Sequence, residues 1–382
     1  MTTMTRRARL MATLRGEPVD RPAVSFYELN GLTQQPENQD PFNIYTHPSW
    51  RPLLELTREK TDRIVVNYVP LANAPPEPLD ELTTVKTDTR NGSRFTVREI
   101  RIGQRVLTQR SRRDPDINTV WTEEHLLKDA DDLRTYLDVP PRVFGGTVVT
   151  ARVLEQEAAL GDTGIVMLDT ADPLCVAASL FDLGTYTVIA MTEQALFRQL
   201  LERIAAVLLP RTEAVAAALP GRLWRIYGPE YATPPYLPPV LFDEYVCTYV
   251  RPMIAAIQRH GGYARIHSHG RVKAVLDAIA GMGADGLDPI EPPPQGDVEL
   301  RDVREKYGRQ MVLFGNLEVS DIENLPTPLF AEKVKQALRE GTAGSGRGFV
   351  LMPSACPYGR ELPALTLKNY ETIIELVEGR GW

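Results

Sequence analysis

The chain has 382 residues, enough for one large domain or two ordinary domains with a substantial buried core. Hydrophobic residues make up 43% and charged residues 24%, as in ordinary globular proteins. The net charge of −7, with short basic clusters only, argues against a nucleic-acid partner. The chain has no apolar run of about 20 residues and no signal-peptide pattern, which predicts a cytoplasmic protein without a membrane partner.

Short apolar runs alternate with longer segments of helical period along most of the chain, which is typical of a parallel sheet built from βα units. The predicted strands are residues 23–27, 63–68, 164–168, 223–227, 263–266, 286–287 with their flanks, 311–314 and 349–352. The predicted helices include residues 192–219, 238–262, 271–283 and 329–341. Eight strands alternating with helices, without a G-x-G-x-x-G turn, favour one α/β domain over residues 1–382, a (β/α)8 TIM barrel.

The alternation is interrupted between residues 70 and 160. Residues 83–112 show a period of two, and Asn91-Gly92 is a typical two-residue hairpin turn. We therefore expect an inserted antiparallel β-hairpin excursion between barrel strands two and three. A small separate subdomain is the alternative.

Polar residues follow nearly every predicted strand. In a (β/α)8 barrel these positions share one rim, where the reacting groups gather. The candidates, in chain order, are Glu28, Asp169, Glu230, His267, His269, Asp288, Glu291, Asn316, Ser354 and Cys356.

His267 and His269 are two residues apart, so their side chains share one face if the strand continues to residue 269. Two imidazoles and the thiolate of Cys356 would suit zinc, with one coordination position open. Alternatively, both histidines bind anionic substrate groups or neighbouring carboxylates. Cys175 and Cys247 lie in apolar helical surroundings, which indicates packing.

The carboxylates indicate a functional site less strongly than the two histidines do. Asp288 and Glu291 are close enough in sequence to share a proton, or to orient the histidines by accepting hydrogen bonds from their rings. Glu28 and Glu230 are candidates for acid or base, with a salt bridge at the barrel rim as the alternative. The aromatic side chains Tyr231 and Tyr236 are candidates for a substrate lid, with simple packing as the alternative.

Three segments together resemble the uroporphyrinogen decarboxylase superfamily: "RRARLMATLRGEPVDRPAV", "IHSHGRVKAVLDAIAGMGADGLDPIEPPPQGD" and the C-terminal "GFVLMPSACPYGRELPALTLKNYETIIELV". The resemblance implies a (β/α)8 barrel with one of two chemistries. One is decarboxylation of a porphyrinogen without a cofactor, and the other is zinc-dependent methyl transfer between corrinoid proteins and thiols.

The segment at residues 26–40, "FYELNGLTQQPENQD", has no arginine where true uroporphyrinogen decarboxylases have an arginine-rich clamp for the carboxylates of the substrate. The chain is therefore more similar to the methyltransferase-like branch. The zinc ligands of that branch correspond to His267, His269 and Cys356, with His269 in place of a cysteine. This substitution places less negative charge on zinc and leaves the reaction open.

These observations lead to a methyltransferase-like enzyme in which zinc assists methyl transfer or demethylation of a small substrate. In this hypothesis Glu28, Glu230, Asp288 and Glu291 serve as acid, base or supporting groups, and Asn316 orients the substrate. One alternative is a metal-free decarboxylase, or carboxy-lyase, in which Asp169 or Glu230 donates the proton. Another is a non-catalytic barrel that binds a corrinoid partner. The resemblance also implies a corrinoid or corrinoid-protein co-substrate and a homodimer.

Overall fold

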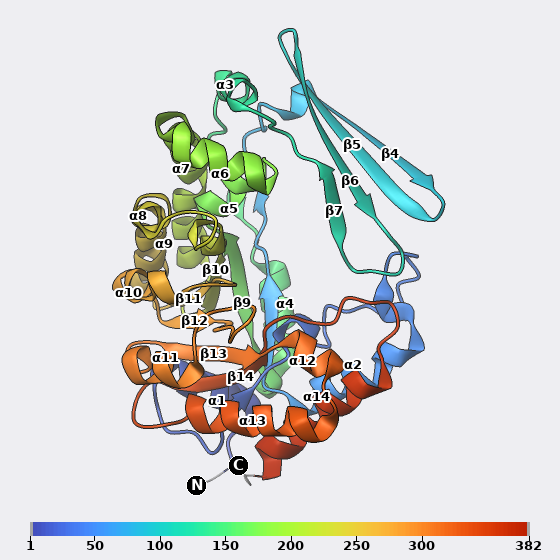
Figure 1. The fold of residues 1–382 in the computed structure, drawn as a ribbon, viewed down its shortest axis with the longest axis vertical. Helices are drawn as coiled ribbons and strands as arrows, with labels where there is room; N and C mark the ends of the chain where they lie inside the picture. Colours follow the sequence, from blue (N-terminus) through green and yellow to red (C-terminus); the bar gives the residue numbers. More distant parts are fainter. Residues whose placement is uncertain (1–2, 380–382) are drawn as a thin grey trace.

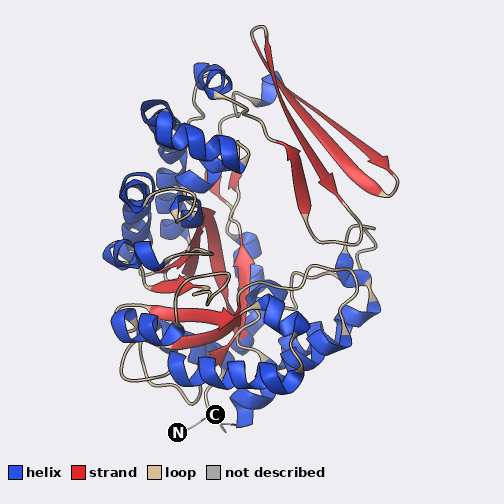
Figure 2. Cartoon of the chain, viewed as in Figure 1, coloured by secondary structure: helices blue, strands red, loops and turns tan. Residues whose placement is uncertain are grey.

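The computed structural model describes residues 3–379. Eight parallel strands curve around a common centre, and helices cover the outer side of this sheet, as Figures 1 and 2 show. The strands are β1 (Ala23–Val24), β2 (Arg63–Asn67), β9 (Gly164–Ala171), β10 (Leu223–Tyr227), β11 (Tyr263–His267), β12 (Gly286–Asp288), β13 (Val312–Leu317) and β14 (Phe349–Pro353). The prediction of an α/β barrel with eight parallel strands is confirmed.

The strand ladder runs in the order β1-β14-β13-β12-β11-β10-β9-β2. Between the two end strands, β1 and β2, the backbone N–H of Asp62 donates to the carbonyl of Val24 over 2.7 Å. The carboxylate of Asp62 also accepts from the backbone N–H of Val24 at 2.9 Å and pairs with Arg9 and Arg21. Asp62 therefore ties the first barrel strand to the second.

The outer helices include the long segments predicted from the sequence. They are α2 (Arg51–Lys60), α4 (Ala151–Leu160), α5 (Pro173–Ala178), α6 (Leu183–Thr192), α7 (Gln194–Ala218), α8 (Pro239–Phe242), α9 (Thr248–Arg259), α10 (Leu276–Gly281), α11 (Leu300–Tyr307), α12 (Val319–Asn324), α13 (Thr327–Gly341) and α14 (Ala364–Gly379). A π-helical turn over Asp243–Cys247 joins α8 to α9. Within residues 3–379, no helix is both long enough and apolar enough to cross a membrane.

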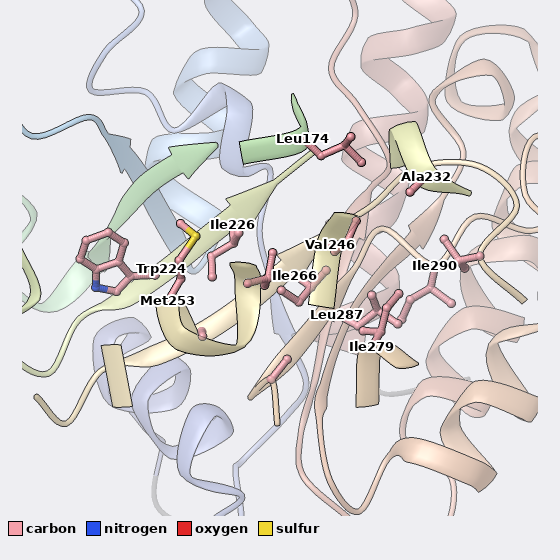
Figure 3. Packing of buried hydrophobic residues seen from close by; sticks show 14 of the residues in the cluster. Leu174, Trp224, Ile226, Ala232, Val246, Met253, Ile266, Ile279, Leu287 and Ile290 are labelled. Carbon is pink, nitrogen blue, oxygen red and sulfur yellow. The ribbon is translucent and has the colours of Figure 1, made fainter. Parts of the chain in front are cut away.

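The barrel strands have two buried faces. On the outer face, Trp224, Ile226 and Ile266 belong to the same apolar cluster as Val246 and Met253 of the covering helical segments (Figure 3). On the inner face, Leu223, Ile165, Val312 and Val350 form a second cluster with Leu10 and Leu14 of helix α1 (Arg6–Arg15). Helix α1 therefore closes the amino-terminal end of the barrel with apolar side chains.

The insertion lies between β2 and β9, as predicted, and is larger than one hairpin. Its four-stranded antiparallel sheet consists of β4 (Thr83–Arg90), β5 (Ser93–Ile102), β6 (Arg105–Arg113) and β7 (Val120–Glu124). A second pair, β3 (Leu71–Ala72) with β8 (Thr147–Val148), lies at its base, together with helix α3 (Ala130–Asp138). The sheet extends away from the barrel in Figure 1.

The tight turn between β4 and β5 was also predicted. Asn91 and Gly92 have φ values of 51° and 84°, so both adopt the left-handed conformation that a two-residue hairpin turn requires. Ile100 and Leu107 are opposite each other in the ladder and fully buried in the main core cluster. These two side chains anchor the inserted sheet to the rest of the fold.

Candidate active site

The inner face of the barrel changes from apolar to polar toward the carboxyl ends of the strands. On β10 and β11, Leu223 pairs in register with Tyr263, and Arg225 pairs two residues later with Arg265. The next inward pair is Tyr227 with His267. Because side chains alternate between faces along a strand, each pair forms one layer of the barrel interior. The polar layers lie at the end opposite helix α1.

His267 is part of a buried series of contacts that also includes Asp288 and Arg265. Its Nδ1 atom lies 2.7 Å from Oδ2 of Asp288. The other carboxylate oxygen, Oδ1, is 2.8 Å from Nε of Arg265 in an ion pair in which both side chains are fully buried. Although burial raises the pKa of Asp288, the charges of Arg265 and His267 lower it below the usual value. Asp288 is therefore an anion that fixes the orientation of the His267 ring.

The guanidinium of Arg265 lies between two aromatic rings. Its carbon is 5.0 Å from the ring centroid of Tyr27 and 4.9 Å from that of Phe314. Such contacts are favourable for a desolvated cation. Sequence reasoning missed Arg265, although an arginine inside the apolar run "YARIH" was a visible signal.

His269 is held in a similar way by Glu291. Its Nδ1 lies 2.7 Å from Oε1 of Glu291, whose Oε2 accepts from the backbone N–H of Gly270 at 2.6 Å. Burial lowers the pKa of His269, but the hydrogen bond and charge of Glu291 outweigh it and raise this pKa to about 9. His269 is therefore an imidazolium at neutral pH, paired with an ionised Glu291.

The two imidazoles are in contact with each other. Their ring centroids are 4.6 Å apart, and the planes are nearly perpendicular at 88°. Both carboxylate contacts use Nδ1, which leaves Nε2 of each ring for another partner. Four of the predicted site residues, His267, His269, Asp288 and Glu291, are thus brought together as two histidine–carboxylate pairs.

Cys356 and Glu28 form a separate contact at the ends of β14 and β1. The backbone N–H of Cys356 donates to Oε2 of Glu28 at 2.9 Å, and Oε1 accepts from the hydroxyl of Tyr27 at 3.1 Å. Burial, followed by the charge of Glu28, raises the pKa of the Cys356 thiol well above its usual value. Without an additional positive charge, the sulfur is a thiol and not a thiolate.

His267, His269 and Cys356 therefore do not form one ligand set in this arrangement. Among residues 3–379, no group of three or more His, Cys, Asp or Glu side chains could hold a metal ion. The histidines have the carboxylate partners that often support metal-binding imidazoles, but a third ligand is not in place. Zinc therefore stays a prediction.

Asp169, a predicted proton donor, is occupied by an ion pair. Its two oxygens contact Nε and Nη2 of Arg225 at 2.7 and 2.9 Å, and Nη1 of Arg225 donates to the Tyr27 hydroxyl at 3.2 Å. A bidentate contact of this kind is among the stronger ion pairs that a carboxylate forms. Asp169 therefore positions Arg225 in the barrel interior.

Glu230 lies near an acid that sequence reasoning missed, Asp172. Asp172 caps α5 by accepting from the backbone N–H of Cys175 at 2.6 Å. Burial, together with the charge of Glu230, raises the pKa of Asp172 well above its usual value. In the described part of the chain, Oδ2 of Asp172 and Oε2 of Glu230 are buried without hydrogen-bond partners. Asp172 is therefore a protonated carboxyl beside Glu230.

The candidates for substrate contact have different surroundings. Tyr231 is half-buried, its ring packs edge-on against Tyr186, and its backbone carbonyl accepts from the Tyr186 hydroxyl at 2.7 Å. Tyr236 is also half-buried, in the loop before α8. Asn316 lines a pocket with Glu318 at the end of β13. The structure places Asn316 beside a cavity, whereas Tyr231 is engaged in packing.

A parallel barrel with charged side chains at the carboxyl ends of its strands is the layout of (β/α)8 barrel enzymes. The model of the family described as uroporphyrinogen decarboxylase (URO-D) matches residues 121–379. This match covers more than half of the chain, which therefore belongs to the uroporphyrinogen decarboxylase family. No curated protein matches the sequence.

Two solved structures show the extent of the structural likeness. A methyltransferase from Methanosarcina mazei aligns over 99% of both chains with a TM-score of 0.59 and 17% sequence identity. This likeness shows a shared fold. A D-psicose 3-epimerase in the presence of D-fructose aligns over 60% of this chain and 85% of its own, with a TM-score of 0.33 and 10% identity. That second likeness is too weak to carry an argument.

Proposed function

We propose that this chain is a methyltransferase-like enzyme that transfers or removes a methyl group of a small substrate at the barrel mouth. The observation that carries the proposal is the pair of adjacent imidazoles, each fixed through Nδ1 by a carboxylate. Membership of the uroporphyrinogen decarboxylase family supports an enzymatic role. The name of the M. mazei protein with the same fold supports methyl transfer as the reaction class.

The two histidines suit two different tasks, proton donation and positioning of the substrate. When a nucleophile displaces an oxygen- or sulfur-bound methyl group, the leaving atom keeps the bonding electron pair and needs a proton. His269, an imidazolium beside Glu291, can donate that proton from Nε2. His267, oriented by Asp288, can hydrogen-bond the methyl donor through Nε2 and position it, because a corrinoid nucleophile carries no proton to remove.

The methyl acceptor in this proposal is a corrinoid, free or bound to a partner protein, as the sequence resemblance implies. Zinc is the second component implied by that resemblance. It would be held by His267, His269 and Cys356, but these side chains do not converge in the present arrangement. Metal analysis of the purified protein tests zinc independently of the roles of the two histidines.

The direct test is incubation with a panel of O-methyl and S-methyl compounds and free cob(I)alamin. Absorbance then reports the methylation of the cobalt. We expect methylcobalamin to form with at least one donor, and the rate to fall in His267→Gln and His269→Gln variants. Binding of cobalamin without transfer from any donor would instead indicate a non-catalytic corrinoid-binding barrel.

One observation favours a second candidate, metal-free decarboxylation. The buried carboxyl of Asp172 stays protonated near Glu230, and loss of carbon dioxide leaves a carbanion that needs such a proton. Asp169, named for this role from the sequence, is instead bound to Arg225. Release of carbon dioxide from a carboxylic acid, abolished by Asp172→Asn and retained in His269→Gln, would favour this candidate over methyl transfer.

A further inference from the structure

A cavity of about 210 Å³ lies beside the histidine site, between the loop after β12, the end of β13 and helices α12 and α13. Pro292, which lines it, directly follows Glu291 in the chain. Its apolar wall includes Pro292, Pro293, Phe330 and Ala337. The cavity is therefore suited to a small molecule with an alkyl part.

The charged side chains that line this cavity are mostly acidic. They are Glu299, Glu318, Asp321 and Glu340, with Lys333 as the only cation among them. Nζ of Lys333 lies 2.9 Å from Oδ2 of Asp321, so these two charges compensate each other. The remaining carboxylates give the cavity a negative potential, which attracts cations.

Glu318 is the most buried of these acids, with only 5% of its surface exposed. Its Oε2 accepts a long hydrogen bond of 3.3 Å from the Ser354 hydroxyl. Its Oε1 is buried and has no hydrogen-bond partner in the part of the chain that the structure describes. A buried carboxylate oxygen without a donor is costly, and a ligand N–H would remove that cost.

The charges around Glu318 also favour the binding of a cation. Burial, and next the negative charge of Glu291, raise the pKa of Glu318 to about 7. The charge of His269 acts on this pKa in the opposite direction and less strongly, so Glu318 lies near the Glu291–His269 pair. A bound cation would favour the ionised form of Glu318.

We propose that this cavity binds the ammonium group of a small amine substrate and that Glu318 selects for the positive charge. The proposal rests on the proposed function, because it places the substrate beside the two histidines. Oε1 of Glu318 would accept from the ammonium N–H, and the alkyl part would contact the proline and phenylalanine wall. The methyl-bearing atom would then extend toward His269.

The test is a pair of ligands of similar shape, titrated into the full chain and followed by calorimetry or ligand-observed NMR. Protonated 2-methoxyethylamine has the ammonium group, and 2-methoxyethanol has a hydroxyl in its place. We expect the wild-type protein to bind the ammonium compound at least about tenfold more tightly, since a hydrogen bond to a charged group contributes roughly 1.5–3 kcal/mol.

Two variants and one control define the role of Glu318. Glu318→Gln should abolish the preference for the ammonium compound, whereas Glu318→Asp should retain part of it. Glu332→Gln removes an exposed carboxylate of helix α13, which borders the cavity, at a position outside the cavity lining, and should leave both affinities unchanged. Equal binding of both compounds by the wild type, no binding of either, or an unchanged preference in Glu318→Gln would overturn the proposal.

The titration requires no turnover. It can therefore contradict the ammonium site without contradicting methyl transfer, and the transfer assay can do the reverse. A retained ammonium preference without methyl transfer from any donor contradicts the proposed function alone. Methyl transfer without a preference for cationic substrates contradicts the assignment of this cavity alone.

Discussion

Nδ1 of His267 lies 2.7 Å from Oδ2 of Asp288, and both residues are at the ends of neighbouring barrel strands, paired in register. Asp288 uses its other oxygen to pair with the fully buried Arg265. One carboxylate therefore orients a candidate catalytic imidazole and also compensates a cation inside the barrel. These two contacts predict that Asp288 contributes to the stability of the fold and, in the proposed function, to the orientation of His267.

Replacing Asp288 with Asn should destabilise the fold, because it leaves the guanidinium of Arg265 buried without its counter-charge. Breaking a buried ion pair on one side costs about 3–5 kcal/mol. Urea unfolding would measure this loss. Asp302→Asn, an exposed position on α11, is the matched control and should change the free energy of unfolding by less than about 0.5 kcal/mol. Equal stability of both variants would contradict a structural role for the Arg265–Asp288 pair.

Replacing His267 with Gln should slow methyl transfer by about 10²-fold, because a misplaced substrate can cost a factor of this size. The comparison variant is His260→Gln, which removes a surface histidine paired with Glu213, outside the barrel mouth. Steady-state rates with a donor found in the panel would measure both. A His267→Gln rate within twofold of the wild-type rate would exclude a positioning role for this residue.

The pH dependence of stability should reveal Glu318. Its folded-state pKa of about 7 is raised above the ordinary value of 4.5, so the stability it contributes is complete below pH 4.5 and lost as the pH rises through 7. The wild type should therefore lose up to about 3 kcal/mol relative to Glu318→Gln over this interval, at about 1.4 kcal/mol per pKa unit. Urea unfolding at pH 4.5, 6 and 8 would measure the difference. A constant difference would contradict the raised pKa.

The thiol of Cys356 should react slowly with iodoacetamide at pH 8, because the thiolate is the reactive form and the pKa is raised. Glu28→Gln removes the nearest negative charge and should accelerate the reaction. Mass spectrometry would follow alkylation at this position, with a chelator present so that bound metal does not protect the sulfur. Rapid alkylation of the wild type would show a thiolate, as the zinc hypothesis requires of a ligand.

Periodicity predicted the strands, the inserted antiparallel segment and the turn at Asn91-Gly92, since these depend on local alternation and turn chemistry. The order of residues at strand ends also predicted that His267, His269, Asp288 and Glu291 lie together. The ladder explains this, because β11 and β12 are neighbours. The residues that follow two adjacent parallel strands lie at the same end of the barrel.

The residues that were missed depend on packing between distant segments. Arg265 lies inside an apolar strand and joins the candidate site only through its contacts with Asp288 and the rings of Tyr27 and Phe314. Glu318 gains its unusual environment from helices α12 and α13, which enclose the cavity. Similarly, Cys356 contacts Glu28 across β14 and β1, and sequence order alone could not show this pairing.

The proposed function requires most directly that His269 is an imidazolium held by Glu291. NMR titration of the His269 ring protons, assigned by comparison with His269→Gln, measures its pKa without a substrate. We expect a pKa of about 9 in the wild type and a marked decrease in Glu291→Gln. A wild-type pKa near the ordinary value of 6.5, unchanged by Glu291→Gln, would contradict the proposed function.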